Sequence, residues 1–165
     1  MTLVFGEMSK AAPILLALLA VAPAAHAAKA PTVQQRMAQI ATAELARNVQ
    51  ELPADSNTGP DISRYHRAVR HAPANYPWCA IFVSWVARRA GYPLGNASQG
   101  IADVQNLFKW GRQHGYYFPK GSREVKVGDI SLHGYGHAGI VVSVDPIVTI
   151  DGNWSDTVLR QPIPY

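Results

Sequence analysis

The sequence predicts an α+β protein in which helices come first and an antiparallel sheet follows. Residues 32–115 carry apolar side chains mostly at helical spacing, whereas residues 126–163 contain short β-branched runs separated by turns. Within the helical region, the stretch at residues 79–87 is nearly all apolar and needs burial on every side. We therefore expect this buried helix to pack on the C-terminal sheet.

The stretch NYPWCAIFVSWVARRAG, at residues 75–91, defines the limits of that helix. Pro77 cannot lie inside a helix and disfavours helical geometry in the residue before it, so the helix should begin at Trp78 or Cys79. Two arginines followed by Gly91 are typical of a helix end. The pattern thus places Cys79 in the first turn.

Cys79 is the only cysteine of the chain. A thiol in the first helical turn lies near unpaired backbone N–H groups and the positive end of the helix dipole, which favour the thiolate over the thiol. This chemistry would make Cys79 a nucleophile. The alternative is that the residue is simply a small buried apolar group.

The N-terminal residues have the pattern of a secretory signal peptide. Lys10 precedes an apolar run at residues 11–25, and the small-residue sequence Ala-His-Ala ends at residue 27. This run is too short to span a bilayer comfortably, so we expect cleavage and no stable membrane insertion. Residues 1–27 are predicted to be the signal peptide, and residues 28–165 a single catalytic domain that is secreted or periplasmic. An exported chain with one cysteine keeps a free thiol in an oxidising space.

The remaining elements are predicted from periodicity and turn residues. We expect further helices at residues 32–50, 61–70 and 97–115, with a loop at residues 52–60. Asp61 is the expected N-cap of the second of these helices. Short antiparallel strands should cover residues 126–133, 136–144, 147–154 and 157–163.

Polar side chains adjoin the predicted strands at places where they can reach Cys79. His137 enters an apolar strand, and a histidine there can direct one ring nitrogen at a thiol and the other at an acceptor. Antiparallel pairing with the next strand would bring Asp151 and Asn153 near His137. The chain then carries a cysteine, a histidine and an orienting side chain, as cysteine hydrolases do.

Three segments, PWCAIFVSW, VKVGDISLHGYGHAGIVVSV and TIDGN, resemble the signature segments of the CHAP family, the cysteine, histidine-dependent amidohydrolases/peptidases. The resemblance covers residues 40–161. It implies a compact papain-like α+β fold and cleavage of amide bonds in peptidoglycan, by an amidase or an endopeptidase, with no metal and no organic cofactor. It also implies that Cys79 is the nucleophile and His137 its base. Asp151 matches an acidic position of the family, and Asn153 matches its asparagine.

Three aromatic residues next to the predicted site are candidates for binding substrate: Tyr76, Trp78 and Trp154. Large aromatic side chains are found more often in the core, so packing is the alternative for each of them.

The formal net charge of +4 suits an anionic polymer but is spread along the chain. No block of lysine and arginine predicts nucleic-acid binding, and we expect a monomer whose partner is peptidoglycan. Two alternative functions remain. One is a catalytically silent peptidoglycan-binding module. The other is a zinc hydrolase that uses His133, His137 and Asp151, although these residues lack the helical two-histidine spacing of such enzymes.

Overall fold

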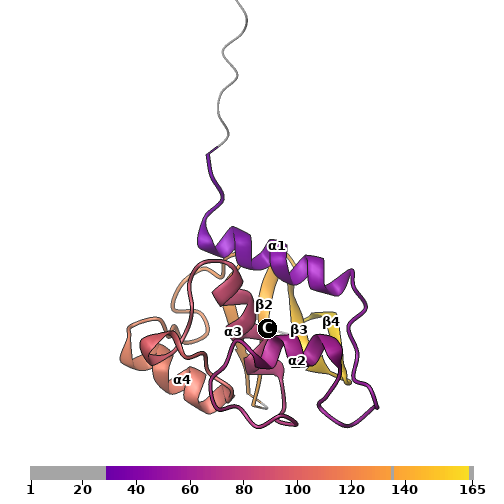
Figure 1. Cartoon of the computed structure of the whole chain (residues 1–165). Helices are drawn as coiled ribbons and strands as arrows, with labels where there is room; N and C mark the ends of the chain where they lie inside the picture. Colours follow the sequence, from indigo (N-terminus) through magenta and orange to yellow (C-terminus); the bar gives the residue numbers. More distant parts are fainter. Residues whose placement is uncertain (1–28, 135, 164–165) are drawn as a thin grey trace, which may run out of the picture.

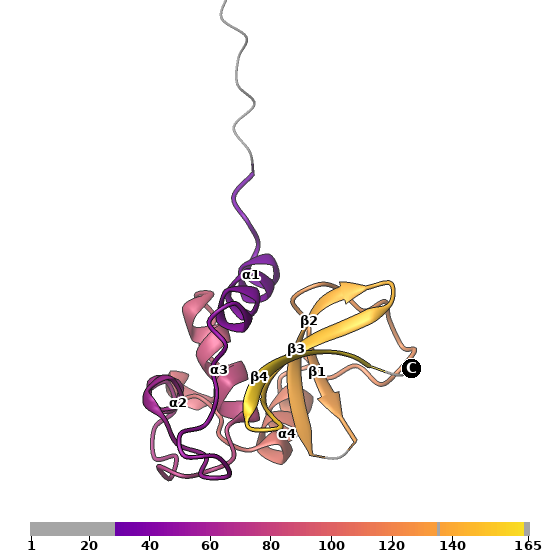
Figure 2. The same ribbon diagram turned by 90° about the vertical axis from the view of Figure 1, so that its right-hand side faces the viewer.

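The computed structural model describes residues 29–134 and 136–163, so the predicted signal peptide lies outside the described residues. The chain is α+β, and Figure 2 shows helices to one side of a twisted sheet. The helices are α1 (Val33–Leu45), α2 (Pro60–His66), α3 (Cys79–Arg89) and α4 (Val104–Gln113), with a short 3₁₀ helix, η1 (Asn96–Ser98). The strands are β1 (Ile130–His133), β2 (His137–Val144), β3 (Ile147–Trp154) and β4 (Thr157–Pro162). No helix in the described ranges is both long enough and apolar enough to cross a bilayer.

The four strands form one antiparallel sheet in chain order, β1-β2-β3-β4, as predicted. Gly139 of β2 pairs with Asp151 of β3, and His133 of β1 pairs with His137 of β2. Beyond Asp151 the pairing of β3 with β4 shifts before it resumes at Trp154. This irregularity changes the direction of the side chains that follow Asp151.

Helix α3 occupies the centre of the molecule, where it packs on β2 and β3 and against α1 and α2 (Figures 1 and 2). It begins at Cys79 and ends at Arg89, which confirms the bounds predicted from the sequence. Every residue from 79 to 87 is buried, and the helix contacts β2, β3, α1 and α2. The nearly all-apolar residues 79–87 are stable in this position because they are covered on every side.

Helix α1 is shorter than the predicted range, residues 32–50, because the last residues of that range pair with the sheet. Its start is as predicted: Thr32 is the N-cap of a capping box. The helix stops at Leu45, after which the Val49 carbonyl accepts a hydrogen bond from the Val158 N–H. Gln50 then forms an isolated bridge to β4, so residues 49–50 have tertiary partners that helical spacing does not reveal.

The other two predicted helices are also trimmed. Gly59, rather than Asp61, is the N-cap of α2, and Pro60 occupies its first turn, where the missing N–H is not needed. Helix α4 begins after Asp103, whose carboxylate caps it, rather than at residue 97. Ala97 has a φ of 49°, which a continuous α-helix does not allow.

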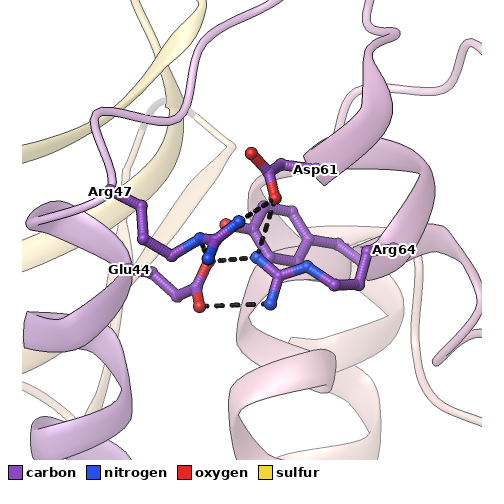
Figure 3. A network of polar contacts seen from close by, with 5 residues as sticks. Glu44, Arg47, Asp61 and Arg64 are labelled. Atoms are coloured by element: carbon purple, nitrogen blue, oxygen red, sulfur yellow. Dashed lines mark hydrogen bonds and ion pairs between the residues drawn. The ribbon is translucent and has the colours of Figure 1, made fainter.

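A network of ion pairs joins α1 to α2 (Figure 3). Glu44 of α1 is buried, and its Oε2 lies 2.5 Å from Nη2 of Arg64 and accepts a 2.5 Å hydrogen bond from the Tyr65 hydroxyl. Asp61 contacts Arg64 at 3.1 Å and Arg47 at 2.6 Å. Burial and Glu44 raise the pKa of Tyr65, so its hydroxyl remains a donor. These contacts satisfy a carboxylate that would otherwise destabilise the core.

Tyr65 extends this network to the start of α3. Its ring stacks on Trp78 with centroids 5.8 Å apart and meets Phe82 edge-on at 5.4 Å. Trp78, the residue immediately before Cys79, therefore packs on the Tyr65 ring, which belongs to α2 and is hydrogen-bonded to Glu44 of α1.

Candidate active site

The site is built from the start of α3 and from β2 and β3. Cys79 is the first residue of α3, is 6% exposed and is the only cysteine in the chain. His137 begins β2, the strand next to β3, which carries Asp151. Both the Cys79 thiol and the Asp151 carboxylate interact with the His137 imidazole. The structure thus brings together Cys79, His137 and Asp151, which are separated along the chain.

The register of β2 and β3 sets the distance between His137 and Asp151. Because Asp151 lies opposite Gly139, it is diagonal to His137, and its Oδ2 is 3.3 Å from Nε2 of the imidazole. This contact is an ion pair whose N–H is not aligned as in a regular hydrogen bond. A Cβ on Gly139 would lie 1.6 Å from Oδ1 of Asp151, so the carboxylate fits only because this residue is glycine.

The charge state of His137 follows from its neighbours. Burial alone lowers its pKa, but the interactions with Asp151 and Cys79 outweigh burial and raise the pKa to about 9. His137 is therefore an imidazolium at neutral pH. Its side chain is 13% exposed, so little water competes for these contacts.

Asp151 is fully buried and is held from a third strand. Gln161 of β4 donates a 2.7 Å hydrogen bond to its Oδ2. Burial raises the pKa of Asp151, but interactions with His137, Thr149 and Gln161 outweigh it and lower the pKa below its usual value. The aspartate is consequently ionised, and its short side chain reaches His137 without a bridging water.

His133 faces the same carboxylate oxygen. Its Nε2 lies 3.6 Å from Oδ2 of Asp151, and its ring centroid is 5.6 Å from that of His137. Burial lowers the pKa of His133, Asp151 raises it, and the neighbouring His137 lowers it further; the net effect is a lowered pKa. Asp151 thus faces one charged imidazole and one neutral imidazole.

Asn153 contacts a different part of the site. It has a φ of 60° within the irregular end of β3, so its side chain leaves the direction of Asp151. In the amide orientation that satisfies its neighbours, its nitrogen donates to Oε1 of Glu51 at 3.0 Å and its oxygen accepts from the Trp78 N–H at 3.1 Å. Asp151, rather than Asn153, makes the contact to His137.

Glu51 is a site residue that sequence reasoning missed. It is buried, and its Oε1 accepts a 2.9 Å hydrogen bond from Nε1 of Trp78 while its Oε2 accepts a 2.7 Å bond from the Asn57 N–H. Together with Asn153, it fixes the residue that precedes Cys79. A single glutamate before a Pro-, Ser- and Asn-containing loop carries no signal of this role.

The three aromatic candidates have different positions. Trp78 is fully buried, so it packs in the core and cannot line a substrate groove, contrary to the expectation from the sequence. Trp154 is partly exposed, and its ring lies edge-on to His137 with centroids 5.0 Å apart. The Tyr76 hydroxyl donates a 3.4 Å hydrogen bond to Asp103. Only Trp154 therefore adjoins the imidazoles directly.

Among the residues that the structure describes, no group of three or more His, Cys, Asp or Glu side chains has the arrangement of a metal site. The contacts of the His137 imidazolium with a thiol and with a buried carboxylate support covalent chemistry. An α+β fold with such a site is typical of hydrolases.

Comparison with protein families identifies the class more closely. Residues 71–153 match the model of the CHAP domain, a segment that includes Cys79, His137 and Asp151. The chain belongs to the CHAP family, whose members are hydrolases of the amidase and peptidase type. Searches of curated proteins and of solved structures gave no significant match.

Proposed function

We propose that this protein is an exported cysteine hydrolase that cleaves amide bonds of peptidoglycan through Cys79, His137 and Asp151. The observation that carries the proposal is that His137 interacts with both the Cys79 thiol and the Asp151 carboxylate, which raise its pKa to about 9. The CHAP-domain match supports a hydrolase of this type. The packing of α3 on the sheet supports a papain-like arrangement of one domain.

The reaction begins with the thiolate of Cys79 attacking the scissile carbonyl. The imidazolium of His137 gives its proton to the leaving amine, so the carbon–nitrogen bond breaks and a thioester forms. The imidazole, now neutral, takes a proton from a water molecule that attacks the thioester. The products are a carboxylic acid and the regenerated pair of Cys79 thiolate and His137 imidazolium.

The tetrahedral intermediate needs donors for its oxyanion. The Cys79 N–H is in the first turn of α3, where backbone donors have no carbonyl within the helix, and it lies beside the sulfur. The helix dipole adds to the stabilisation at this end. The first donor is accordingly the nucleophile's own backbone.

Digestion of purified peptidoglycan by residues 28–165 tests the proposal. Cys79→Ala should remain folded and release no fragments, and iodoacetamide should inactivate the wild type by modifying its single cysteine. Fragment release by Cys79→Ala at the wild-type rate would refute the mechanism. Binding to peptidoglycan without digestion by the wild type would indicate a silent binding module. Loss of activity in EDTA, restored by zinc, would favour the zinc hydrolase.

His133 and His137 both contact the Asp151 carboxylate, so the same substitution at each provides a matched comparison. His137→Gln should abolish digestion because it removes the proton donor, whereas His133→Gln should reduce it modestly. The opposite ranking would assign the base to His133.

A further inference from the structure

A groove lies next to His133, beside the proposed catalytic residues. It has a volume of about 550 Å³ and runs between α4, the segment of residues 116–125 and β1. At one end it reaches His133 and Gly134, where β1 finishes. We call it the aromatic groove.

Three consecutive aromatic side chains on the 116–125 segment present their rings to solvent. Tyr116 is 55% exposed, Tyr117 39% and Phe118 49%, although apolar groups of this size are usually covered. All three line the groove, together with Phe108 and Trp110 of α4. A contiguous exposed aromatic surface of this kind usually marks a binding site.

These exposed rings are held in fixed positions. Tyr116 stacks on Trp110 with centroids 5.5 Å apart and 29° between the ring planes, and Tyr117 meets Phe108 edge-on at 4.8 Å. The Tyr116 hydroxyl also accepts a 2.7 Å hydrogen bond from Tyr92. The groove is therefore preorganised, which lowers the entropy lost when a ligand binds.

The aromatic groove adjoins the site of chemistry at His133. His133, at its end, is 3.6 Å from Asp151 through Nε2, and its ring is 5.6 Å from the ring of His137. A ligand that fills the groove thus extends to within one side chain of the reacting residues. The groove is therefore close enough to His137 and Asp151 to be part of the proposed substrate site.

The charges of the groove indicate which part of peptidoglycan it takes. Its lining contains two basic and two acidic side chains, Lys120, Arg123, Glu124 and Asp129, and Arg123 is already paired with Asp129 at 2.8 Å. The lining has no excess positive charge with which to hold the carboxylates of a stem peptide. Neutral pyranose rings, in contrast, place their C–H faces against aromatic rings without needing a counter-charge.

We propose that the aromatic groove binds a sugar of the glycan strand, so that the bond presented to Cys79 is the amide joining the sugar's lactyl group to the first amino acid of the stem. This inference rests on the proposed function and assigns the amidase reaction. A bond forms between Sγ and the lactyl carbonyl carbon, and the bond from that carbon to nitrogen breaks. The His137 proton goes to the released stem amine. Water then converts the thioester into a lactyl carboxylate and the free thiol.

Product analysis distinguishes this reaction from its alternative. Purified peptidoglycan is digested with the wild type, and the fragments are identified by mass spectrometry. We expect stem peptides with free N-terminal amines and sugar chains with free lactyl carboxylates. Fragments cut within the stem or cross-bridge, with the sugar still attached to its stem, would overturn the groove assignment while leaving the proposed function intact. An absence of any fragments would instead refute the proposed function.

Variants of the exposed rings test the groove itself. With a soluble muramoyl peptide as substrate, Tyr117→Ala and Phe118→Ala should each raise KM about tenfold with a smaller change in kcat, because each removes a stacking surface remote from the reacting atoms. Val144→Ala, an equally exposed apolar residue at the far end of β2, serves as control and should leave KM unchanged. A KM unaffected by both aromatic substitutions, in folded variants, would refute sugar binding in the groove.

Discussion

Replacing Asp151 by asparagine removes the charge that keeps His137 protonated and changes little else in the shape of the site. Oδ2 of Asp151 is 3.3 Å from Nε2 of His137, and the pKa of this histidine is about 9. An opposite charge at such a distance shifts a pKa by about 1–3 units. Burial, which lowers the pKa of His137, remains in the variant. The basic limb of the activity profile should therefore move from near pH 9 to between about pH 6 and 8.

The position of this limb is measured as kcat/KM against pH. Asp145→Asn is the matched control, because it makes the same charge change in the exposed turn at the other end of β2. Its profile should be that of the wild type. A basic limb that remains near pH 9 in Asp151→Asn would show that another group holds the charge of His137.

Three further predictions concern the structural support of the site. Gly139→Ala should abolish activity because its Cβ would lie 1.6 Å from Oδ1 of Asp151; digestion at the wild-type rate by folded Gly139→Ala would contradict this reasoning. Glu51→Gln should lower the free energy of unfolding by about 1–3 kcal/mol, measured in urea, since a buried donor loses its acceptor. An unchanged midpoint would argue against the stabilising role of the Glu51 hydrogen bonds. The wild-type free energy of unfolding should fall as pH rises from 6.5 to about 9, because His137 binds a proton in the folded state that it loses when unfolded. The same decline in His137→Gln would point to a different group.

Helix α3 and the sheet were predictable because local signals enclose them. Pro77 and Gly91 mark the ends of the buried helix, and turn residues separate the β-branched runs. The end of α1 was not predictable, since Val49 and Gln50 leave the helix to pair with β4, a contact more than 100 residues away along the chain. Tertiary pairing overrides helical spacing there.

The proposed catalytic residues were predictable to the extent that their positions follow from strand pairing. His137 and Asp151 lie on neighbouring strands of one hairpin, so alternation and antiparallel register bring them together. The same alternation fails for Asn153, because the positive φ at this residue turns its amide toward Trp78. Glu51 was missed because its role depends on the three-dimensional approach of a loop to α3.

The contacts of Glu51 and Gln161 bear on how the catalytic unit can be transferred between proteins. Both residues lie outside residues 71–153, the segment that matches the CHAP domain, yet one holds the residue before the nucleophile and the other holds Asp151. A fusion protein that carried only the matched segment would expose the indole N–H of Trp78 and leave Asp151 without its third-strand donor. We therefore expect the smallest segment that preserves the site to extend from the start of α1 to the end of β4, and segments exchanged between relatives should be joined outside those two limits.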